Sequence, residues 1–281
     1  MCGNIKRKII IANNSGFCFG VERAIKLAEE LAEKYKNVYT LDAILHNEEE
    51  VKRLKEKGIM PIKDLEKGGE VLILPAHGAT KEETRIAKKN FKKIVDTTCP
   101  LVLRTVKIIE KLVKENYGIV IVGDEGHREV KVLSNAAGEN LIGIFKDSEE
   151  VPDKKYGKIG IVAQSTAFKD MLFSVTEKFL RYSKEVRFFN TVCDETLRRQ
   201  KEAQTIALKT DCVIVIGGKA SANTNRLVEI AKKINKNTFF VQNESGIKRI
   251  DLSRCKTIGI ISGTSTPRWL INKVIKEIEK K

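Results

Sequence analysis

Three cysteines occupy the same kind of position in this chain of 281 residues. Each ends a short polar segment that follows an apolar, strand-like stretch, and the segments are Asn14–Cys18, Asp96–Cys99 and Asn190–Cys193. An arginine follows each cysteine five residues later, which makes the three segments copies of one plan. Three thiolates gathered at one point would suit a cubane iron–sulfur cluster whose fourth iron has no protein ligand. Such an iron is open to a substrate.

The remaining cysteines carry no such context, and we expect them to be non-functional. Cys212 begins the apolar run Cys212–Ile216, Cys255 precedes another strand-like run, and Cys2 lies close to the start of the chain. No signal-peptide pattern is visible, and no stretch approaches the roughly 18 apolar residues that span a bilayer. We therefore expect a cytoplasmic protein without membrane association, whose thiols stay reduced.

The three histidines of the chain each follow a strand-like run. His46 precedes Asn47–Glu50, a helix N-cap pattern with an acidic first turn, while His77 and His127 lie in short glycine-containing loops. A single loop histidine is usually a solvated side chain. Three in similar loops indicate an anion site, because imidazoles and helix N-termini both offer donors to phosphate oxygens.

Loops rich in hydroxyl and amide side chains extend this pattern. They are Gln164–Thr166, Ser221–Arg226 and Gly263–Pro267. Each alone is typical of an ordinary helix N-cap, but together with the histidines they predict a diphosphate pocket. Neither glycine-rich nucleotide-binding motif occurs. Glu129, two residues after His127, is either a surface carboxylate paired with Arg128 or a proton donor in that pocket.

Strand-like runs alternate with amphipathic helical stretches along the whole chain, which predicts an α/β protein with parallel sheets. The expected strands are Lys8–Ala12, Val38–Leu41, Val71–Leu74, Lys93–Asp96, Ile119–Val122, Ile142–Phe145, Ile159–Ala163, Val186–Phe189, Cys212–Ile216, Thr238–Val241 and Thr257–Ser262. The repeated segments predict three pseudo-equivalent lobes at 16–98, 99–192 and 193–281, with 1–15 joining the third. Their strand-end loops are expected to face one centre, since ligands bind beyond the carboxyl ends of parallel strands.

Several motifs together resemble those of the 4-hydroxy-3-methylbut-2-enyl diphosphate reductases, which catalyse the last step of non-mevalonate isoprenoid synthesis. The matching segments are Gly16–Ala24, His46–Asn47, Ala76–Gly78, Asp96–Pro100, Glu125–Val130 and Ser221–Leu227. The resemblance implies a trefoil of three α/β lobes around a [4Fe–4S] cluster held by Cys18, Cys99 and Cys193. It implies substrate contacts from His46, His77, His127, Ser165, Ser221, Asn223 and Ser265, and proton supply by Glu129.

The same resemblance implies reductive removal of the allylic hydroxyl, with the substrate oxygen on the fourth iron and an electron donor such as ferredoxin or flavodoxin. Four positions depart from the family's usual pattern. They are Asp124 where a second histidine is common, Ser165 for threonine, Ala222 for serine and Glu195 for a small residue. None of them removes an expected ligand.

Two other function classes stay open at this stage. A non-redox iron–sulfur hydro-lyase would use the open iron as a Lewis acid and need no electron donor. The net charge of +15 admits a nucleic-acid-binding module, although it equally fits lysine-rich solvated helix faces. We expect no nucleic-acid partner, because aromatic residues make up 6% of the chain and no stacking motif is visible.

Overall fold

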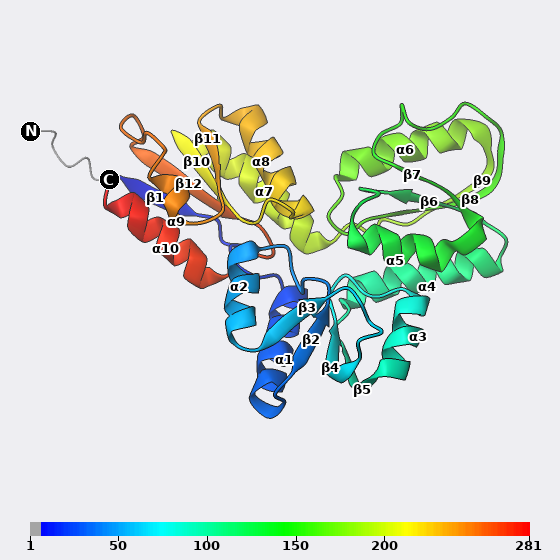
Figure 1. Ribbon diagram of the computed structural model, residues 1–281. Coiled ribbons are helices and arrows are strands. Elements are labelled where there is room, and N and C mark those ends of the chain that lie inside the picture. The colour runs from blue at the N-terminus through cyan, green and yellow to red at the C-terminus, as the bar shows by residue number, and fades with distance from the viewer. Residues whose placement is uncertain (1–6) are drawn as a thin grey trace, which may run out of the picture. The chain divides into compact units, whose positions relative to one another are not determined.

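The structure, a computed structural model, describes residues 7–281 as alternating strands and helices (Figure 1). Within that range the strands form three four-stranded sheets, and every strand pair is parallel. The predicted α/β class with parallel sheets is confirmed. The central strands are runs of Ile and Val that are fully buried, as in Ile119–Val122 and Cys212–Ile216, because helices cover both faces of a parallel sheet.

The bounds of the strands follow the apolar runs. They are β1 Lys8–Ile11, β2 Val38–Leu41, β3 Ile59–Ile62, β4 Gly69–Leu74, β5 Phe91–Asp96, β6 Gly118–Val122, β7 Leu141–Phe145, β8 Tyr156–Ala163, β9 Ser183–Phe188, β10 Cys212–Ile216, β11 Thr238–Val241 and β12 Thr257–Ser262. The helices are α1 Phe19–Lys34, α2 Glu48–Glu56, α3 Lys81–Asn90, α4 Pro100–Lys114, α5 Arg128–Ala137, the 3-10 turn η1 Gly138–Asn140, α6 Lys169–Tyr182, α7 Asp194–Lys209, α8 Ala222–Ile234, α9 Glu244–Ile247 and α10 Arg268–Glu279.

The three sheets share one strand order. Read from one edge, they run β1-β12-β10-β11, β5-β4-β2-β3 and β9-β8-β6-β7. The first strand in each order is the one whose following loop carries a predicted cluster cysteine. The repeat seen in the sequence therefore corresponds to a repeat of sheet topology.

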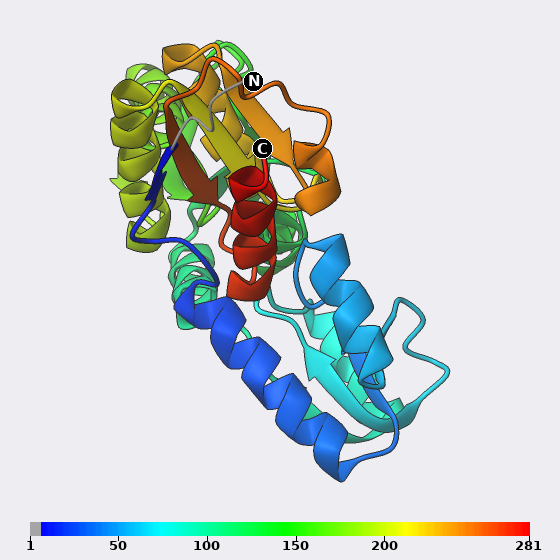
Figure 2. The same ribbon diagram turned by 90° about the vertical axis from the view of Figure 1, so that its left-hand side faces the viewer.

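Each sheet is covered by helices that bury an apolar stripe. Figure 1 shows α7 and α8 on one side of the β1-β12-β10-β11 sheet and α9 and α10 on the other, and Figure 2 shows α10 lying across the sheet. The core on the α10 side joins Ile214 and Ile260 of the strands to Leu270 and Val274 of the helix. These helical positions are four apart and therefore lie on one face.

The other two sheets are packed in the same way. Leu72 and Leu74 of β4 pack with Ala87 of α3. On the β7-β6-β8-β9 sheet, α4 and α5 cover one face, where Ile109 and Val130 meet the strands, while Figure 1 shows α6 on the opposite face.

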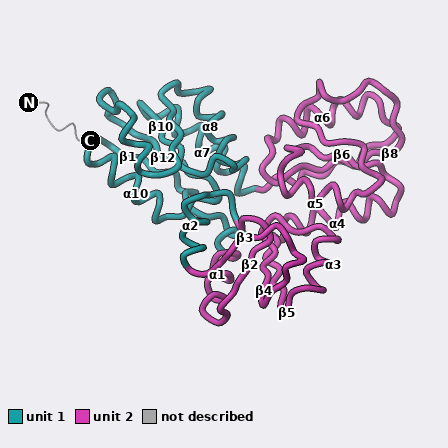
Figure 3. Tube along the Cα trace, viewed as in Figure 1, with its two compact units in different colours: residues 1–22, 45–56, 194–281 teal, residues 23–44, 57–193 magenta. Residues whose placement is uncertain are grey.

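The chain divides into two compact units, shown in Figure 3. Unit 1 comprises residues 1–22, 45–56 and 194–281, and unit 2 comprises residues 23–44 and 57–193. Unit 1 contains the β1-β12-β10-β11 sheet, and unit 2 contains the other two sheets. The three-lobe boundaries expected at 98/99 and 192/193 stay a prediction.

One strand, β3, was not predicted. It contains Pro61, which has no backbone N–H and normally argues against a strand. The structure places β3 at the edge of its sheet, paired only with β2 on one side, where a missing donor costs little.

Candidate functional site

The predicted cluster cysteines occupy equivalent backbone positions in the three sheets. Each stands one residue before a helix, at the starts of α1, α4 and α7. Each backbone N–H also donates to a carbonyl in the loop after the neighbouring strand: Cys18 to Thr264 at 3.1 Å, Cys99 to Ala76 at 2.9 Å and Cys193 to Ser165 at 2.9 Å. None of the three cysteines forms a disulfide, and all three are partly exposed. The expectation that they lie where strands run into helices is confirmed.

Within unit 2, Cys99 and Cys193 lie close enough for their thiols to interact. Burial raises the pKa of the Cys99 thiol, the backbone N–H groups of Leu101 and Val102 oppose that rise, and the charges of Cys193 and Glu129 add to it. An iron ion would reverse this balance, because metal coordination deprotonates a thiol outright. Partly exposed thiols outside disulfides are the soft donors that an iron–sulfur cluster requires, so these residues fit the group.

The cysteines expected to be non-functional are core residues where the structure describes them. Cys212 and Cys255 are buried in the apolar core between the first sheet and α10. Burial, together with the hydrogen bond and charge of Cys255, raises the pKa of Cys212 far above its usual range. Its thiol is therefore unreactive at physiological pH. Cys2 lies outside the described residues.

Glu129 is a buried carboxylate in unit 2, and it does not pair with Arg128. It is 1% exposed, and both its oxygens accept hydrogen bonds of 2.6 Å from Ser165, one from the backbone N–H and one from the hydroxyl. Burial raises the pKa of Glu129, although the two bonds from Ser165 act in the opposite direction. The surface ion-pair interpretation of Glu129 is wrong. A buried carboxyl with a raised pKa is suited to holding and releasing a proton.

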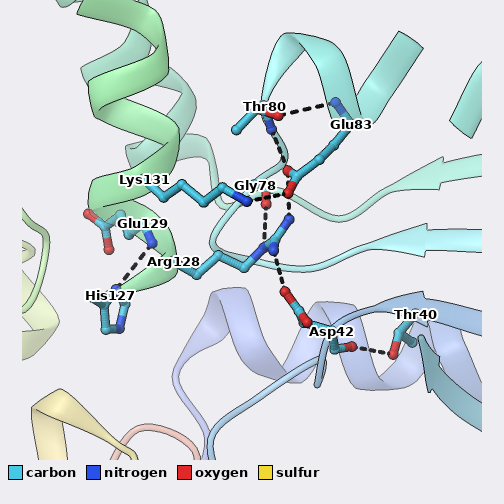
Figure 4. Close-up of polar contacts among 9 residues, drawn as sticks. All are labelled: Thr40, Asp42, Gly78, Thr80, Glu83, His127, Arg128, Glu129 and Lys131. Atoms are coloured by element: carbon cyan, nitrogen blue, oxygen red, sulfur yellow. Dashed lines mark hydrogen bonds and ion pairs between the residues drawn. The ribbon is translucent and has the colours of Figure 1, made fainter. Parts of the chain in front are cut away.

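Two of the histidines lie next to each other in unit 2. The rings of His77 and His127 meet edge to face, with their centroids 4.9 Å apart. His127 caps α5, and its Nδ1 accepts a hydrogen bond of 3.1 Å from the N–H of Glu129 (Figure 4). A ring nitrogen that accepts carries no proton, so neutral His127 holds its proton on Nε2 and can donate there.

Arg128 is a site residue that sequence reasoning missed. Its side chain is 9% exposed, and its guanidinium bonds Asp42, Glu83 at 2.9 Å and the carbonyl of Gly78 at 3.2 Å (Figure 4). Gly78 directly follows His77, so Arg128 connects the loop of His77 to α5, the helix that His127 caps. Asp42 has a left-handed backbone, with φ of 56°. Nothing in the sequence linked Asp42 to Arg128, which lies 86 residues further along the chain.

The acidic partner Glu83 is itself fixed in place. It forms a capping box with Thr80 at the start of α3, and Lys131 bonds its other oxygen at 2.8 Å. Burial alone would raise the pKa of Glu83, but the bonds from Lys131 and Thr80 and the charges of Arg128 and Lys131 lower it overall. Glu83 is therefore ionised at neutral pH, as the pair with Arg128 requires.

In unit 1, three loops meet around the backbone of His46. The Ser265 hydroxyl donates to the His46 carbonyl at 3.1 Å. A Cβ at Gly218 would lie 2.3 Å from the same oxygen, so only glycine allows the β10–α8 loop to approach so closely. Asn47 accepts from the N–H of Glu50 at 3.2 Å, which confirms the predicted N-cap of α2.

The start of α8 holds an unsatisfied amide. Asn223 is 3% exposed, and among the described residues neither its Oδ1 nor its Nδ2 has a hydrogen-bond partner. Ser221 caps the helix by accepting from the N–H of Thr224 at 3.2 Å, and the first turn contains no acidic residue. An unpaired buried amide costs about 1–3 kcal/mol, so its presence beside a helix N-terminus marks a place for an anionic ligand.

The departures from the family pattern have local partners. The Asp124 backbone N–H donates to Gln164 at 2.9 Å, and Glu195 pairs with Arg199 at 2.9 Å inside α7. Arg199 also bonds the Ser262 carbonyl at 3.2 Å, so Glu195 helps to hold α7 on the first sheet. Ala222 is the first residue of α8 and has no side-chain donor.

The predicted site residues fall into one set in each unit. Unit 1 holds Cys18, His46, Ser221, Asn223 and Ser265, and unit 2 holds His77, Cys99, His127, Glu129, Ser165 and Cys193. Both sets follow the carboxyl ends of parallel strands, as expected. Across residues 7–281, no helix is both long and apolar enough to cross a membrane.

Comparison with known proteins gives consistent matches over almost the whole chain. The model of the LytB protein family matches residues 9–279. A 4-hydroxy-3-methylbut-2-enyl diphosphate reductase of Geobacter sulfurreducens is 37% identical over 276 residues, covering 97% of both chains. One of Geobacter sp. strain M21 is 40% identical over 276 residues, covering 96% of both.

Solved structures agree with these sequence matches. The structure of an (E)-4-hydroxy-3-methyl-but-2-enyl diphosphate reductase, described as the terminal enzyme of the non-mevalonate pathway, is 36% identical with a TM-score of 0.71. It covers 98% of this chain and 100% of its own. The Plasmodium falciparum E-1-hydroxy-2-methyl-but-2-enyl-4-diphosphate reductase is 28% identical with a TM-score of 0.86, covering 96% of this chain and 87% of its own. The chain belongs to the LytB protein family.

Proposed function

We propose that this chain reduces 4-hydroxy-3-methylbut-2-enyl diphosphate. Two electrons and two protons would remove the allylic hydroxyl as water and leave isopentenyl and dimethylallyl diphosphates. The names of the relatives support this reaction. The observation that carries the proposal is the equivalent placement of Cys18, Cys99 and Cys193, each before a helix and each with its N–H bonded to the neighbouring loop.

In this proposal the three cysteines hold a [4Fe–4S] cluster. The family supports an iron–sulfur cofactor, and three cysteines in equivalent positions, none of them in a disulfide, support a cubane with three protein ligands. When bound, the cluster would supply electrons one at a time and an iron with an open position. The fold contributes the orientation of the thiols, since each cysteine is fixed by its helix and by one backbone bond.

The diphosphate would be bound by His46, His77, His127, Ser221, Asn223 and Ser265. The buried, unpaired amide of Asn223 at the start of α8 supports this assignment most directly. His127 can donate from Nε2, because its Nδ1 is occupied by the N–H of Glu129. Each charge-assisted bond of this kind contributes about 1.5–3 kcal/mol.

Glu129 would supply the protons. Its burial favours the protonated form, and the two bonds from Ser165 fix the orientation of the carboxyl group. Ser165 was expected among the substrate contacts, and its hydroxyl is donated to Glu129 in this structure. We therefore assign Ser165 to positioning the acid. A general acid of this kind contributes roughly 10²–10⁴-fold to a rate.

The electrons would come from a carrier protein such as a ferredoxin or flavodoxin, and the cytoplasmic location stays a prediction. The test is anaerobic reconstitution with iron and sulfide, followed by electron paramagnetic resonance and turnover with reduced methyl viologen. The proposal requires about four irons per chain, and isopentenyl and dimethylallyl diphosphates as products. Substrate should also alter the spectrum of the reduced cluster.

Two further measurements separate the alternatives. Turnover of a phosphorylated substrate without any reductant would identify a hydro-lyase and overturn the reductase assignment. Strongly salt-dependent RNA binding that is indifferent to loss of all three cysteines would identify a nucleic-acid-binding module.

A further inference from the structure

After Pro100, the exposed residues of α4 are all basic or leucine. These residues are Leu101, Leu103, Arg104, Lys107, Lys111 and Lys114. The single acidic residue of α4, Glu110, has a side chain that is 38% exposed and pairs with Lys81 of α3 at 3.1 Å. Four positive charges therefore line one face of the helix, and one of them, Lys111, has an acidic neighbour in Glu115, whose carboxylate lies 4.0 Å from its Nζ. Helix α6, by contrast, exposes both signs, as in the pair of Glu177 and Arg181.

A small apolar hollow adjoins this basic face. It has a volume of about 120 Å³, and Leu103, Val106 and Val132 form part of its wall, together with the charged residues Lys81 and Asp96. Leu103 is 41% exposed, so the hollow is open at the helix surface. An apolar recess next to a charged border is the usual arrangement of a specific protein–protein interface, where one inserted side chain gives most of the affinity.

The basic face begins beside a proposed cluster ligand. Cys99 immediately precedes Pro100, the first residue of α4. At a rise of about 1.5 Å per residue, Arg104 lies about 8 Å and Lys107 about 12 Å along the axis from Cys99. A protein that docks on this face would bring a redox centre close to the Cys99 end of the helix.

We propose that the α4 face formed by Leu103, Arg104, Lys107, Lys111 and Lys114 is the docking surface for an acidic electron-carrier protein. The inference rests on the proposed function, which requires a one-electron donor. Charge complementarity identifies the occupant as acidic, since a cluster of exposed positive charges steers negatively charged partners and raises association rates. The exchange needs only a transient complex, for which a small interface is sufficient.

The test compares two charge-reversal variants that make the same change in net charge. Arg104→Glu/Lys107→Glu alters the α4 face, and Lys88→Glu/Lys89→Glu alters equally exposed lysines in the last turn of α3. Each holoenzyme is assayed with an acidic ferredoxin, reduced by NADPH and a ferredoxin reductase, and separately with reduced methyl viologen. Binding of oxidised ferredoxin is measured by calorimetry, which does not depend on turnover.

We expect the α4 variant to raise the KM for ferredoxin by about tenfold or more at low ionic strength, and to weaken ferredoxin binding equally. The difference in KM and in binding between the α4 variant and the parent protein should shrink in 0.5 M salt, where exposed charges are screened within a few ångströms. Viologen-driven turnover should be unchanged in both variants, and the α3 variant should use ferredoxin normally. Equal losses of ferredoxin binding and ferredoxin-dependent turnover in both variants, or no such loss in the α4 variant, would overturn the proposed docking surface. If the unsubstituted protein shows no turnover with reduced viologen but binds ferredoxin through α4, the proposed reaction is overturned, whereas the docking surface is supported.

Discussion

Replacing Arg128 with methionine tests whether its ion-pair network holds the histidine loops together. Methionine keeps much of the side-chain volume but removes the bonds to Asp42, Glu83 and the Gly78 carbonyl. Removing one partner of a fully buried pair costs about 3–5 kcal/mol. Here Asp42 is 33% exposed and Glu83 keeps its bond to Lys131, so we expect about 2–3 kcal/mol. That corresponds to a loss of roughly 4–12 °C in Tm for a unit of this size.

The chain offers a matched control for this change. Arg85 forms a two-bond pair with Glu82 at 2.6 and 2.8 Å, and both residues are well exposed. Thermal unfolding followed by circular dichroism on the cluster-free chain should show a clear loss for Arg128→Met and little change for Arg85→Met. A double-mutant cycle with Glu83→Gln should give a coupling energy of about 1–2 kcal/mol for the pair of Arg128 and Glu83.

The functional consequence separates positioning from simple stability. Arg128 bonds the residue after His77 and begins the helix that His127 caps, so its loss should raise the KM for the diphosphate more than it lowers kcat. The iron content should stay unchanged. Equal Tm losses in the Arg128→Met and Arg85→Met variants, or a normal KM in a destabilised Arg128→Met variant, would refute this reasoning.

Three further predictions concern the proposed site. Cys18→Ser, Cys99→Ser and Cys193→Ser should each lose most of the bound iron, whereas Cys212→Ser should retain it, as measured by iron analysis and paramagnetic resonance. Asn223→Ala should raise the KM by roughly 10–100-fold without lowering Tm, because the amide that it removes has no partner within the described chain. Glu129→Gln should reduce turnover about 100-fold or more. Burial raises the folded-state pKa of Glu129, so the contribution of this group to stability is complete below about pH 4.5 and is lost as pH rises. In unfolding scans on the cluster-free chain, Glu129→Gln should therefore be more stable than the parent only above that pH.

The local pattern of apolar residues predicted most of the strands, and it missed strand ends where exposed polar residues interrupt that pattern. Four strands have the bounds expected from their apolar runs, among them β2 and β10. The strand β8 begins three residues earlier than expected, at Tyr156, because Gly157 and Lys158 are exposed and carry no apolar signal. Edge strand β9 likewise begins with polar residues. Edge strands meet a partner on one side only, so their composition is less constrained.

The site was predictable as far as residue type and strand-end position determine it. The cysteines, the histidines and Glu129 could be selected in this way. Arg128 could not, because its partners Asp42 and Glu83 lie far away in the sequence and only the folded unit brings them together. The burial of Asn223 without a partner is likewise a property of packing, since the sequence alone reads as an ordinary first helical turn.

The repeated position of the cysteines has a physical reason beyond symmetry. The residue before a helix normally carries an oxygen side chain that accepts from the first turn, but Cys99 makes no such cap to α4. A thiol there leaves the first N–H groups of the helix directed at sulfur, and these groups stabilise a thiolate. In the free chain, burial outweighs this effect and keeps the Cys99 thiol protonated. A cationic iron centre would shift the balance, so Cys99, which is a poor cap for α4, becomes a well-placed anionic ligand.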